Sequence, residues 1–204
     1  LRQDLRYVEA YQDHVATLER ELAMIRQSPL IREKSTVAEA LGRAIRAHAQ
    51  EFEVVVGQIE TLGLNEEKGL RGTLRSAVHA IEKKFKAANL DNLTVKMLMM
   101  RRHEKDFMLR GSEKYINSVR ARRDEFKALL PTTGLPEQEK AEIVGLLDVY
   151  VTSFEAFSKL SVEEKAAVER LSVIYLDVTL AVEELVSFSD QGAASARVSM
   201  AEMQ

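Results

Sequence analysis

The sequence predicts an all-α protein, an elongated antiparallel helical bundle of about six helices in two stacked modules. Apolar residues recur at alternating intervals of three and four along almost the whole chain, which is the spacing of a buried helical stripe. Only three Pro and nine Gly interrupt the 204 residues, so helix breakers are few. No segment alternates apolar and polar residues with a period of two, and we therefore expect no sheet.

Three helical segments are expected in the first half of the chain: the first carries a stripe from Leu1 to Ile25, the second follows Pro29 and ends near Leu62, and the third runs from about Leu70 to Ala88. Ser35 and Thr36 are residue types that cap a helix at its start. The stretch "LGLNEEKG" (62–69) predicts a tight turn before the third segment. The apolar stripes of the three segments are Leu1, Leu5, Val8, Tyr11, Val15, Leu18, Leu22 and Ile25; Val37, Leu41, Ile45, His48, Phe52, Val55, Ile59 and Leu62; and Leu70, Leu74, Ala77, Ile81, Phe85 and Ala88.

Three further segments are expected in the second half. "NLDN" (89–92) predicts a break with Asp91 or Asn92 as the cap, after which a fourth segment runs to about Leu130. "PTTGLPEQ" (131–138) is a loop, and Ser161 with Glu164 fits a capping box that separates the fifth segment from the sixth. The stripes of the last two segments are Ile143, Leu147, Tyr150, Phe154, Phe157 and Leu160, and Leu171, Tyr175, Val178, Val182 and Leu185.

Composition excludes several functional classes. A nucleic-acid module needs a basic face, whereas the formal net charge here is −3, so we expect no nucleic-acid partner. The absence of Cys removes thiol catalysis, Cys-ligated zinc and disulfides. The four His show no HExxH spacing, and no CxxCH, phosphate loop or Ser/His/Asp arrangement is present. We expect no metal, no cofactor and no enzymatic activity.

No apolar run approaches the ~18–20 residues of a membrane-spanning helix. The chain begins without Met and both of its ends have helical character. We therefore expect either that flanking segments such as membrane spans lie outside this chain or that it is a trimmed piece of some other protein.

The densest charge cluster stands in "MLMMRRHEKDFMLRG" (97–111). The stripe that runs through the fourth segment places Arg102 and Lys105 at consecutive core positions, with Arg101 beside them. A cation in a bundle core is costly unless it is paired. The full stripe is Val95, Leu98, Arg102, Lys105, Leu109, Ser112, Ile116, Val119, Arg123 and Phe126.

Two interpretations of this cluster remain open from spacing alone. Asp106 lies four residues from both Arg102 and Arg110, so ion pairs on one helix could fix the register of the bundle. Alternatively, Arg side chains from several helices could form a pocket for a small carboxylate, which the guanidinium fork matches. Counting residues along the helices puts a further set at about the level of Lys105, namely His14, Thr17, Arg20, Arg170, Tyr175 and Thr179.

Three stretches resemble the helical bimodular sensor domain of bacterial methyl-accepting chemotaxis receptors and of some sensor histidine kinases. They are "MLMMRRHEKDFMLRG" (97–111), "LGLNEEKGLRGTLRSAVHAIE" (62–82) and "VYVTSFEAF" (149–157), together roughly a quarter of the chain. The Arg-Arg-x-Glu-Lys-Asp-Phe core is their most specific part. The resemblance implies two stacked helical bundles and a receptor that works as a homodimer.

The same resemblance implies that residues 1–204 form a single extracytoplasmic sensor domain, held between two spans of the bacterial cytoplasmic (inner) membrane and facing the periplasm. Its membrane-proximal module would comprise about 1–30 and 95–204, and its membrane-distal module about 35–95. Relatives of this kind bind small organic acids such as dicarboxylates or acetate through Arg residues of several helices.

Carried over to this chain, the resemblance favours the anion pocket. Arg101 and Arg102 match the family's motif directly, and Asp106 would hold their side chains in place. Lys105, Arg170, His14, Arg20, Tyr175 and Thr179 complete the expected ligand site, with Arg110 in the supporting network. Binding would shift the last helix slightly and so signal across the membrane. The alternatives are a structural or protein-interaction bundle and the sensor of a histidine kinase. The sequence leaves open the ligand, a second distal site and the sign of the response.

Overall fold

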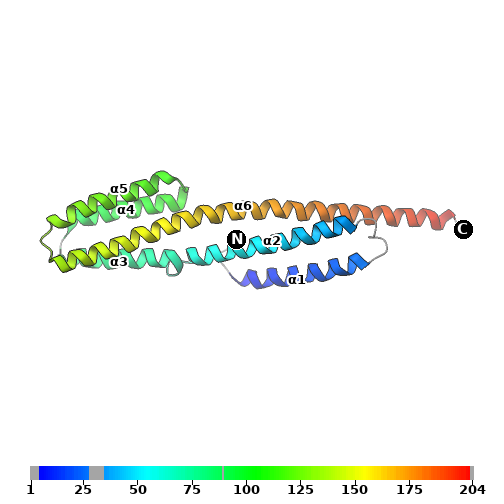
Figure 1. Ribbon diagram of the computed structural model, residues 1–204, viewed down its shortest axis with the longest axis horizontal. Coiled ribbons are helices and arrows are strands. Elements are labelled where there is room, and N and C mark those ends of the chain that lie inside the picture. The colour runs from blue at the N-terminus through cyan, green and yellow to red at the C-terminus, as the bar shows by residue number, and fades with distance from the viewer. Residues whose placement is uncertain (1–4, 28–34, 89, 203–204) are drawn as a thin grey trace. The chain divides into compact units, whose positions relative to one another are not determined.

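The computed structural model describes residues 5–27, 35–88 and 90–202, and every regular element within them is a helix. The expected all-α fold is confirmed. Leu1, Pro29 and Asn89 lie outside the described residues. The elements, in chain order (Figure 1), are α1 (Arg6–Gln27), α2 (Ser35–Leu62), α3 (Gly69–Ala88), α4 (Asp91–Arg110), α5 (Glu113–Leu129), the 3-10 helix η2 (Leu130–Thr132) and α6 (Glu137–Glu202).

The turn between α2 and α3 lies where the sequence predicts it, and glycine explains why it can be so tight. Gly63 and Gly69 have φ angles of 104° and 57°, which side-chain-bearing residues rarely adopt. A Cβ on Gly63 would collide with the backbone carbonyl of Lys68, and one on Gly69 with that of Thr61. The close approach of the two backbone segments therefore requires both glycines.

The prediction of one continuous fourth segment to about Leu130 is wrong, because the chain reverses at residues 111–112. Gly111 has a φ of 64° and donates its N–H to the Phe107 carbonyl at 2.7 Å, which ends α4. Ser112 is extended and α5 starts at Glu113. α4 and α5 form an antiparallel pair (Figure 1). The predicted caps at Asp91 or Asn92 are also wrong, since the N-cap of α4 is Leu90 and it has no side-chain cap.

The predicted break at Ser161 is wrong as well, because α6 is one helix of 66 residues. A capping box needs an N-cap residue with non-helical backbone, whereas Ser161 lies within the helix. No Pro or Gly stands between 146 and 191 to stop the helix. Two errors thus compensate, and the described residues contain the expected six α-helices with a different division of the chain.

The chain divides into two compact units, which also differ from the expected modules. Unit 1 comprises residues 1–56 and 166–204, and unit 2 comprises residues 57–165. Residues 95–165, which we expected to belong with the two ends of the chain, instead pack with α3. The reason is the reversal at Gly111, because it folds α5 back along α4 within the same unit.

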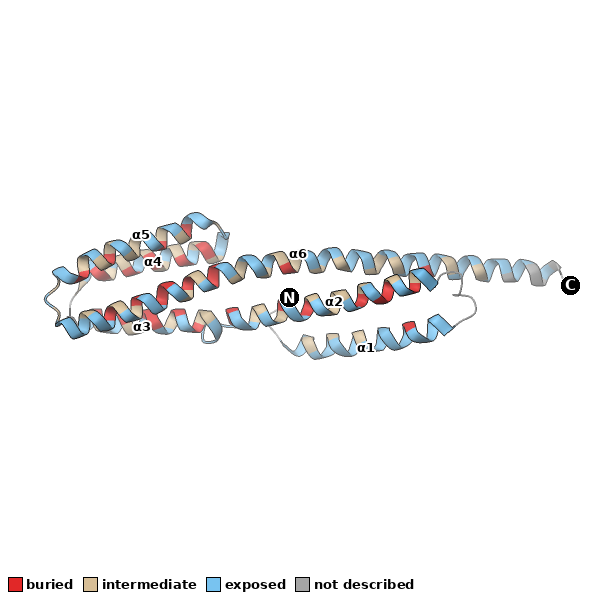
Figure 2. Ribbon diagram, in the orientation of Figure 1, coloured by how far each residue is buried: buried red, intermediate tan, exposed pale blue. Residues whose placement is uncertain are grey.

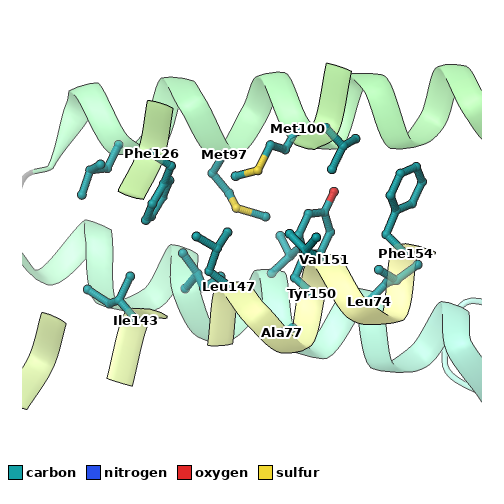
Figure 3. Packing of buried hydrophobic residues seen from close by; sticks show 14 of the residues in the cluster. Leu74, Ala77, Met97, Met100, Phe126, Ile143, Leu147, Tyr150, Val151 and Phe154 are labelled. Atoms are coloured by element: carbon teal, nitrogen blue, oxygen red, sulfur yellow. The ribbon is translucent and has the colours of Figure 1, made fainter. Parts of the chain in front are cut away.

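Unit 2 is built around a core shared by α3, α4, α5 and the first part of α6. Buried residues gather on the sides of these helices that face one another (Figure 2). Figure 3 shows Met97 and Met100 of α4 facing Leu147 and Tyr150 of α6. The edge-on contact of Phe107 with a second core aromatic, Phe154, has a 5.7 Å separation between ring centroids. The stripes predicted for the third and fifth segments are confirmed as core for their described members, with Leu70 and Leu160 partly buried at its edge; the side chain of Ala88 lies outside what the structure describes.

Unit 1 has a smaller core in which α1, α2 and the later part of α6 meet. Its buried members are Leu22, Ala38, Leu41, Ile45 and Leu185. The stripe predicted for α2 is confirmed, but the stripes of the first and sixth segments are confirmed only in part. The stripe positions that are exposed instead are Leu5, Leu18, Ile25, Tyr175 and Val182.

Candidate functional site

The buried stripe of α4 differs from the predicted one. Arg102 and Lys105 were expected on it, but their side chains are 82% and 61% exposed. Their predicted neighbours Val95, Leu98 and Leu109 are exposed too. The prediction failed because the spacing was followed through Gly111 into the next helix, which faces differently. The buried residues of α4 are Leu93, Met97, Met100, Glu104 and Phe107, again spaced four and three apart.

The charge that the core of unit 2 does contain is therefore an acid, Glu104, which is 0% exposed. The Nη1 of Arg101 donates to both carboxylate oxygens of Glu104, at 2.7 and 2.6 Å. The hydroxyl of Tyr150 on α6 donates to Glu104 Oε2 at 2.9 Å. The Nζ of Lys105 lies 3.3 Å from Oε1. Charge-assisted bonds of this kind compensate the burial of a carboxylate.

Tyr150 is fixed by this arrangement in its neutral form. Burial raises the pKa of its hydroxyl well above the usual 10.0, and the nearby negative charge of Glu104 and the hydrogen bond to it raise the pKa further. A phenolate would face the Glu104 carboxylate at a buried position, where like charges repel strongly. Tyr150 therefore remains a donor throughout the neutral pH range and connects α6 to α4.

The predicted supporting network lies on the surface. Asp106 is 4.0 Å from Arg102 and 3.8 Å from Arg110, the two partners expected from spacing. Exposed pairs at such distances contribute little free energy. Arg110 also donates to the Tyr115 hydroxyl at 2.6 Å, and this bond raises the Arg110 pKa above its ordinary value. Arg110 is thus oriented by its neighbours on both sides of the reversal at residue 111.

The remaining candidates belong to unit 1, whereas Arg101, Arg102 and Lys105 belong to unit 2. His14 bonds the Ala10 carbonyl of its own helix, and Arg20 bonds Thr17 and the Ala16 carbonyl of α1. Thr179 donates to the carbonyl of Tyr175, whose side chain is 60% exposed. Arg170 is paired with Glu51 of α2 at 2.8 Å. These five residues thus have separate partners and do not form one cluster. His14, Arg20 and Thr179 bond within their own helices, whereas Arg170 and the Tyr175 ring, whose centroid is 6.0 Å from that of His48, contact α2.

His48, which was predicted on the apolar stripe of α2, is partly buried and belongs to a group of aromatic residues in unit 1. The hydroxyl of Tyr11 lies 2.5 Å from His48 Nδ1, and the Tyr11 ring stacks on Phe52 with 3.9 Å between centroids. Burial lowers the His48 pKa, so the neutral ring that accepts from Tyr11 is favoured. This group pins α1 to α2.

The cationic hollow that sequence reasoning missed lies in unit 2, where α4 ends. We call it the basic hollow; its volume is about 530 Å³. Arg71 of α3, Arg110 of α4 and Lys165 of α6 line it, with Glu164 as the acidic member. The other lining residues are Leu62, Phe107, Met108, Leu109, Gly111, Phe157, Ser161 and Val162.

Arg71 is held in a defined position at this hollow. Its Nη1 donates to the Gly63 carbonyl at 3.3 Å, and its guanidinium carbon lies 5.7 Å from the centre of the Phe157 ring. The only sequence signal for Arg71 was its place in "LGLNEEKGLRG", directly after the tight turn. Its approach to Arg110 and Lys165 depends on the chain reversal at Gly111, which was not predicted.

A second hollow, of about 430 Å³, shares Phe107, Gly111 and Val162 with the first. We call it the mixed hollow. Its two cations lie near acids: Arg120 Nε is 2.7 Å from Glu155, and the exposed Lys159 Nζ is 3.9 Å from Glu163. The two hollows therefore differ in charge, since the lining of the mixed hollow also includes the acid Glu113.

A scan of protein-family models and searches of curated proteins and of solved structures found no match to this chain. Among the described residues, none of the helices combines the length and the apolarity that crossing a bilayer requires. The same residues contain no cluster of His, Asp and Glu suited to a metal ion.

Proposed function

We propose that this chain is the ligand-binding sensor domain of a bacterial transmembrane receptor and that it recognises a small organic-acid anion. The observation that carries the proposal is the continuity of α6. Its residues 137–165 belong to the unit that holds the basic hollow, and the same helix continues through unit 1 to Glu202. A ligand that moves α6 at the hollow would therefore act on a helix that reaches the end of the described chain.

The charge of the basic hollow supports an anion as the ligand. Three basic residues from three helices line the hollow, whereas Glu164 is the only acid among the lining residues that the structure describes. Arg side chains match the geometry of a carboxylate. A small-molecule site typically has a volume of about 300–1,000 Å³, a range that includes this hollow. The Arg101 side chain is engaged with Glu104, so we place ligand recognition at the basic hollow instead of at the Arg101–Arg102 pair.

Signalling would follow from a shift in populations. An anion that binds better when Arg71, Arg110 and Lys165 approach one another favours that arrangement of α3, α4 and α6. From Lys165 to Glu202, α6 extends for roughly 55 Å at about 1.5 Å per residue. A displacement of ~1–2 Å is typical of helices in switching proteins. The proposal involves no bond chemistry.

The resemblance of "RRHEKDF" to the bimodular sensor family supports the remaining parts of the proposal. On that basis the receptor works as a homodimer in the bacterial inner membrane, the sensor faces the periplasm, and the spans flank this chain. The output would be that of a chemotaxis receptor or, alternatively, of a histidine kinase.

A structural or protein-interaction bundle is the second candidate, and one observation favours it. The Arg101–Glu104–Tyr150 network binds α4 to α6 in a single register and needs no ligand to satisfy its charges. If this were the whole role of the charge cluster, the domain would bind no small anion.

Isothermal titration calorimetry of the 204-residue chain against acetate, succinate, malate, citrate, hexanoate and phenylacetate tests the proposed function. We expect at least one acid to bind, and the amide of that acid to bind much more weakly because it lacks the charge. If none of the acids binds at millimolar concentration while circular dichroism shows a folded helical protein, the sensor proposal is wrong and the structural bundle is favoured.

A further inference from the structure

We propose that the basic hollow is the ligand seat and that it selects a carboxylate with an apolar body over a hydrophilic dicarboxylate. This inference rests on the proposed sensor function and names its site and ligand class.

The three basic residues form a clamp because each comes from a different helix. Arg71 is preset by its bond to the Gly63 carbonyl and by its position over the Phe157 ring. Arg110 is oriented by the hydroxyl of Tyr115. Lys165 makes no ion pair with any residue that the structure describes, so its charge is available to a carboxylate there. A single anion would therefore connect α3, α4 and α6.

The apolar part of the hollow indicates what the ligand carries besides its charge. Phe107 and Phe157 line it from the core, and each is only 2% exposed. Leu109 and Val162 also line it, yet they are 79% and 58% exposed. Exposed apolar side chains that gather beside a hollow are a common mark of a binding site. A ligand with an apolar body would cover them.

Volume and charge together exclude the simplest acids as the best ligands. A hollow of about 530 Å³ would remain mostly filled with water around a two-carbon acid. The second charge of a dicarboxylate or citrate would meet another of the three cations, but its short hydrophilic body would leave the apolar lining uncovered. A monocarboxylate with a hydrocarbon or aromatic body satisfies both the cations and the apolar lining.

The mixed hollow provides an internal comparison. It lies beside the same Phe107 and Val162, but three acids line it, Glu113, Glu155 and Glu163, against two cations, Arg120 and Lys159. Arg120 is already bonded to Glu155 at 2.7 Å, so a carboxylate is less favoured there than in the basic hollow. Lys159 is therefore a matched control for Lys165, since both are exposed lysines of α6 beside neighbouring hollows.

Calorimetry with hexanoate, phenylacetate and succinate on the folded chain and three variants tests the inference. We expect hexanoate or phenylacetate to bind better than succinate. Lys165→Gln should weaken that binding about fivefold or more, because it removes one charge-assisted hydrogen bond, whereas Lys159→Gln should change it less than twofold. Leu109→Ser should weaken the apolar acids severalfold. None of these exposed sites contributes to the core, so the circular dichroism spectra should be unchanged.

The outcomes separate the inference from the function on which it rests. If succinate binds best, or if Lys165→Gln and Lys159→Gln have equal effects, the seat is elsewhere and this inference is overturned while the sensor function stands. If none of the three acids nor the wider set of organic acids binds the folded chain, the sensor proposal fails as well.

Discussion

The substitution Tyr150→Phe removes the one hydroxyl that connects α6 to the buried carboxylate of α4. The ring stays in place, so no cavity is created. The bond that disappears is 2.9 Å long and its acceptor is the Glu104 carboxylate. Hydrogen bonds to charged groups contribute about 1.5–3 kcal/mol to stability. Glu104 keeps its two bonds from Arg101 and so is not left without a partner. We therefore expect a loss near the lower end of that range, about 1.5 kcal/mol.

Urea denaturation followed by far-ultraviolet circular dichroism measures this loss at neutral pH. Tyr7→Phe is the matched control, because Tyr7 is 52% exposed and the same atom is removed from the surface. We expect the control to change the free energy of unfolding by less than about 0.5 kcal/mol. Equal free energies of unfolding for Tyr150→Phe, Tyr7→Phe and the unsubstituted chain would refute the reasoning about the network.

The pH dependence of the same difference tests the ionisation state of Tyr150. Its pKa in the folded protein is raised above the 10.0 of the unfolded chain by burial and by Glu104. The resulting stabilisation is fully present below pH 10 and is lost as the pH rises beyond it, by at most about 1.4 kcal/mol per pH unit. Above pH 10 the unsubstituted chain should therefore lose stability faster than Tyr150→Phe does. Parallel pH profiles would show that Tyr150 ionises as freely in the folded chain as in the unfolded one.

Three further predictions concern other parts of the chain. Arg101→Met should lower the free energy of unfolding in urea by about 3–5 kcal/mol, because it removes the main partner of a buried carboxylate. Arg102→Met should lower it by less than about 0.5 kcal/mol. Equal losses would contradict the assignment of Glu104, and not Arg102, to the buried stripe. Gly111→Ala should cost only the ~1–2 kcal/mol of left-handed backbone strain, because a Cβ there meets no atom within 4 Å. Gly63→Ala should cost more than that strain, because a Cβ there also collides with the backbone of Lys68. Burial lowers the pKa of His48, so its titration midpoint in proton NMR should lie below the usual 6.5. Its contribution to stability should be present above pH 6.5 and lost as the pH falls through the lowered pKa. A midpoint at the usual pKa would contradict the burial of His48 against Tyr11.

The stripes of α2, α3 and the first part of α6 could be predicted because spacing alone decides which side of a continuous helix is apolar. Leu74, Ile81, Leu147 and Phe154 all occupy the core positions expected of them. Spacing no longer indicates the buried side once the helix stops. The chain reverses at Gly111, so the buried side of α5 cannot be found by continuing the three-and-four spacing of α4.

The reversal at residue 111 nevertheless has a sequence signal. Gly followed by Ser and Glu in "RGSEK" combines a favoured helix end with a favoured helix start. The Ser161–Glu164 pattern is a capping box without a preceding glycine, and there the helix continues. A capping box alone is thus weak evidence for a break, whereas a glycine directly followed by an N-cap residue, as in Gly111-Ser112, is stronger.

The candidate site was less predictable than the fold. The charge cluster of residues 97–111 does contain a buried ionic network, but the buried partner is Glu104 and the cations surround it. The basic hollow combines Arg71, Arg110 and Lys165, which are far apart in the sequence. Their proximity depends on a reversal and on a helix continuation that the apolar spacing does not reveal.

The continuity of α6 restricts how the length of this chain can vary. Each residue of an α-helix turns the following part by about 100°. One residue inserted between Leu147 and Phe157, which both belong to the core of unit 2, would therefore rotate Phe157 by that angle about the helix axis relative to Leu147. An insertion of seven residues would change the angle by only about 20°. Homologous chains should accordingly differ in this part of α6 by multiples of about seven residues, a pattern that the loop at 133–136 has no reason to obey.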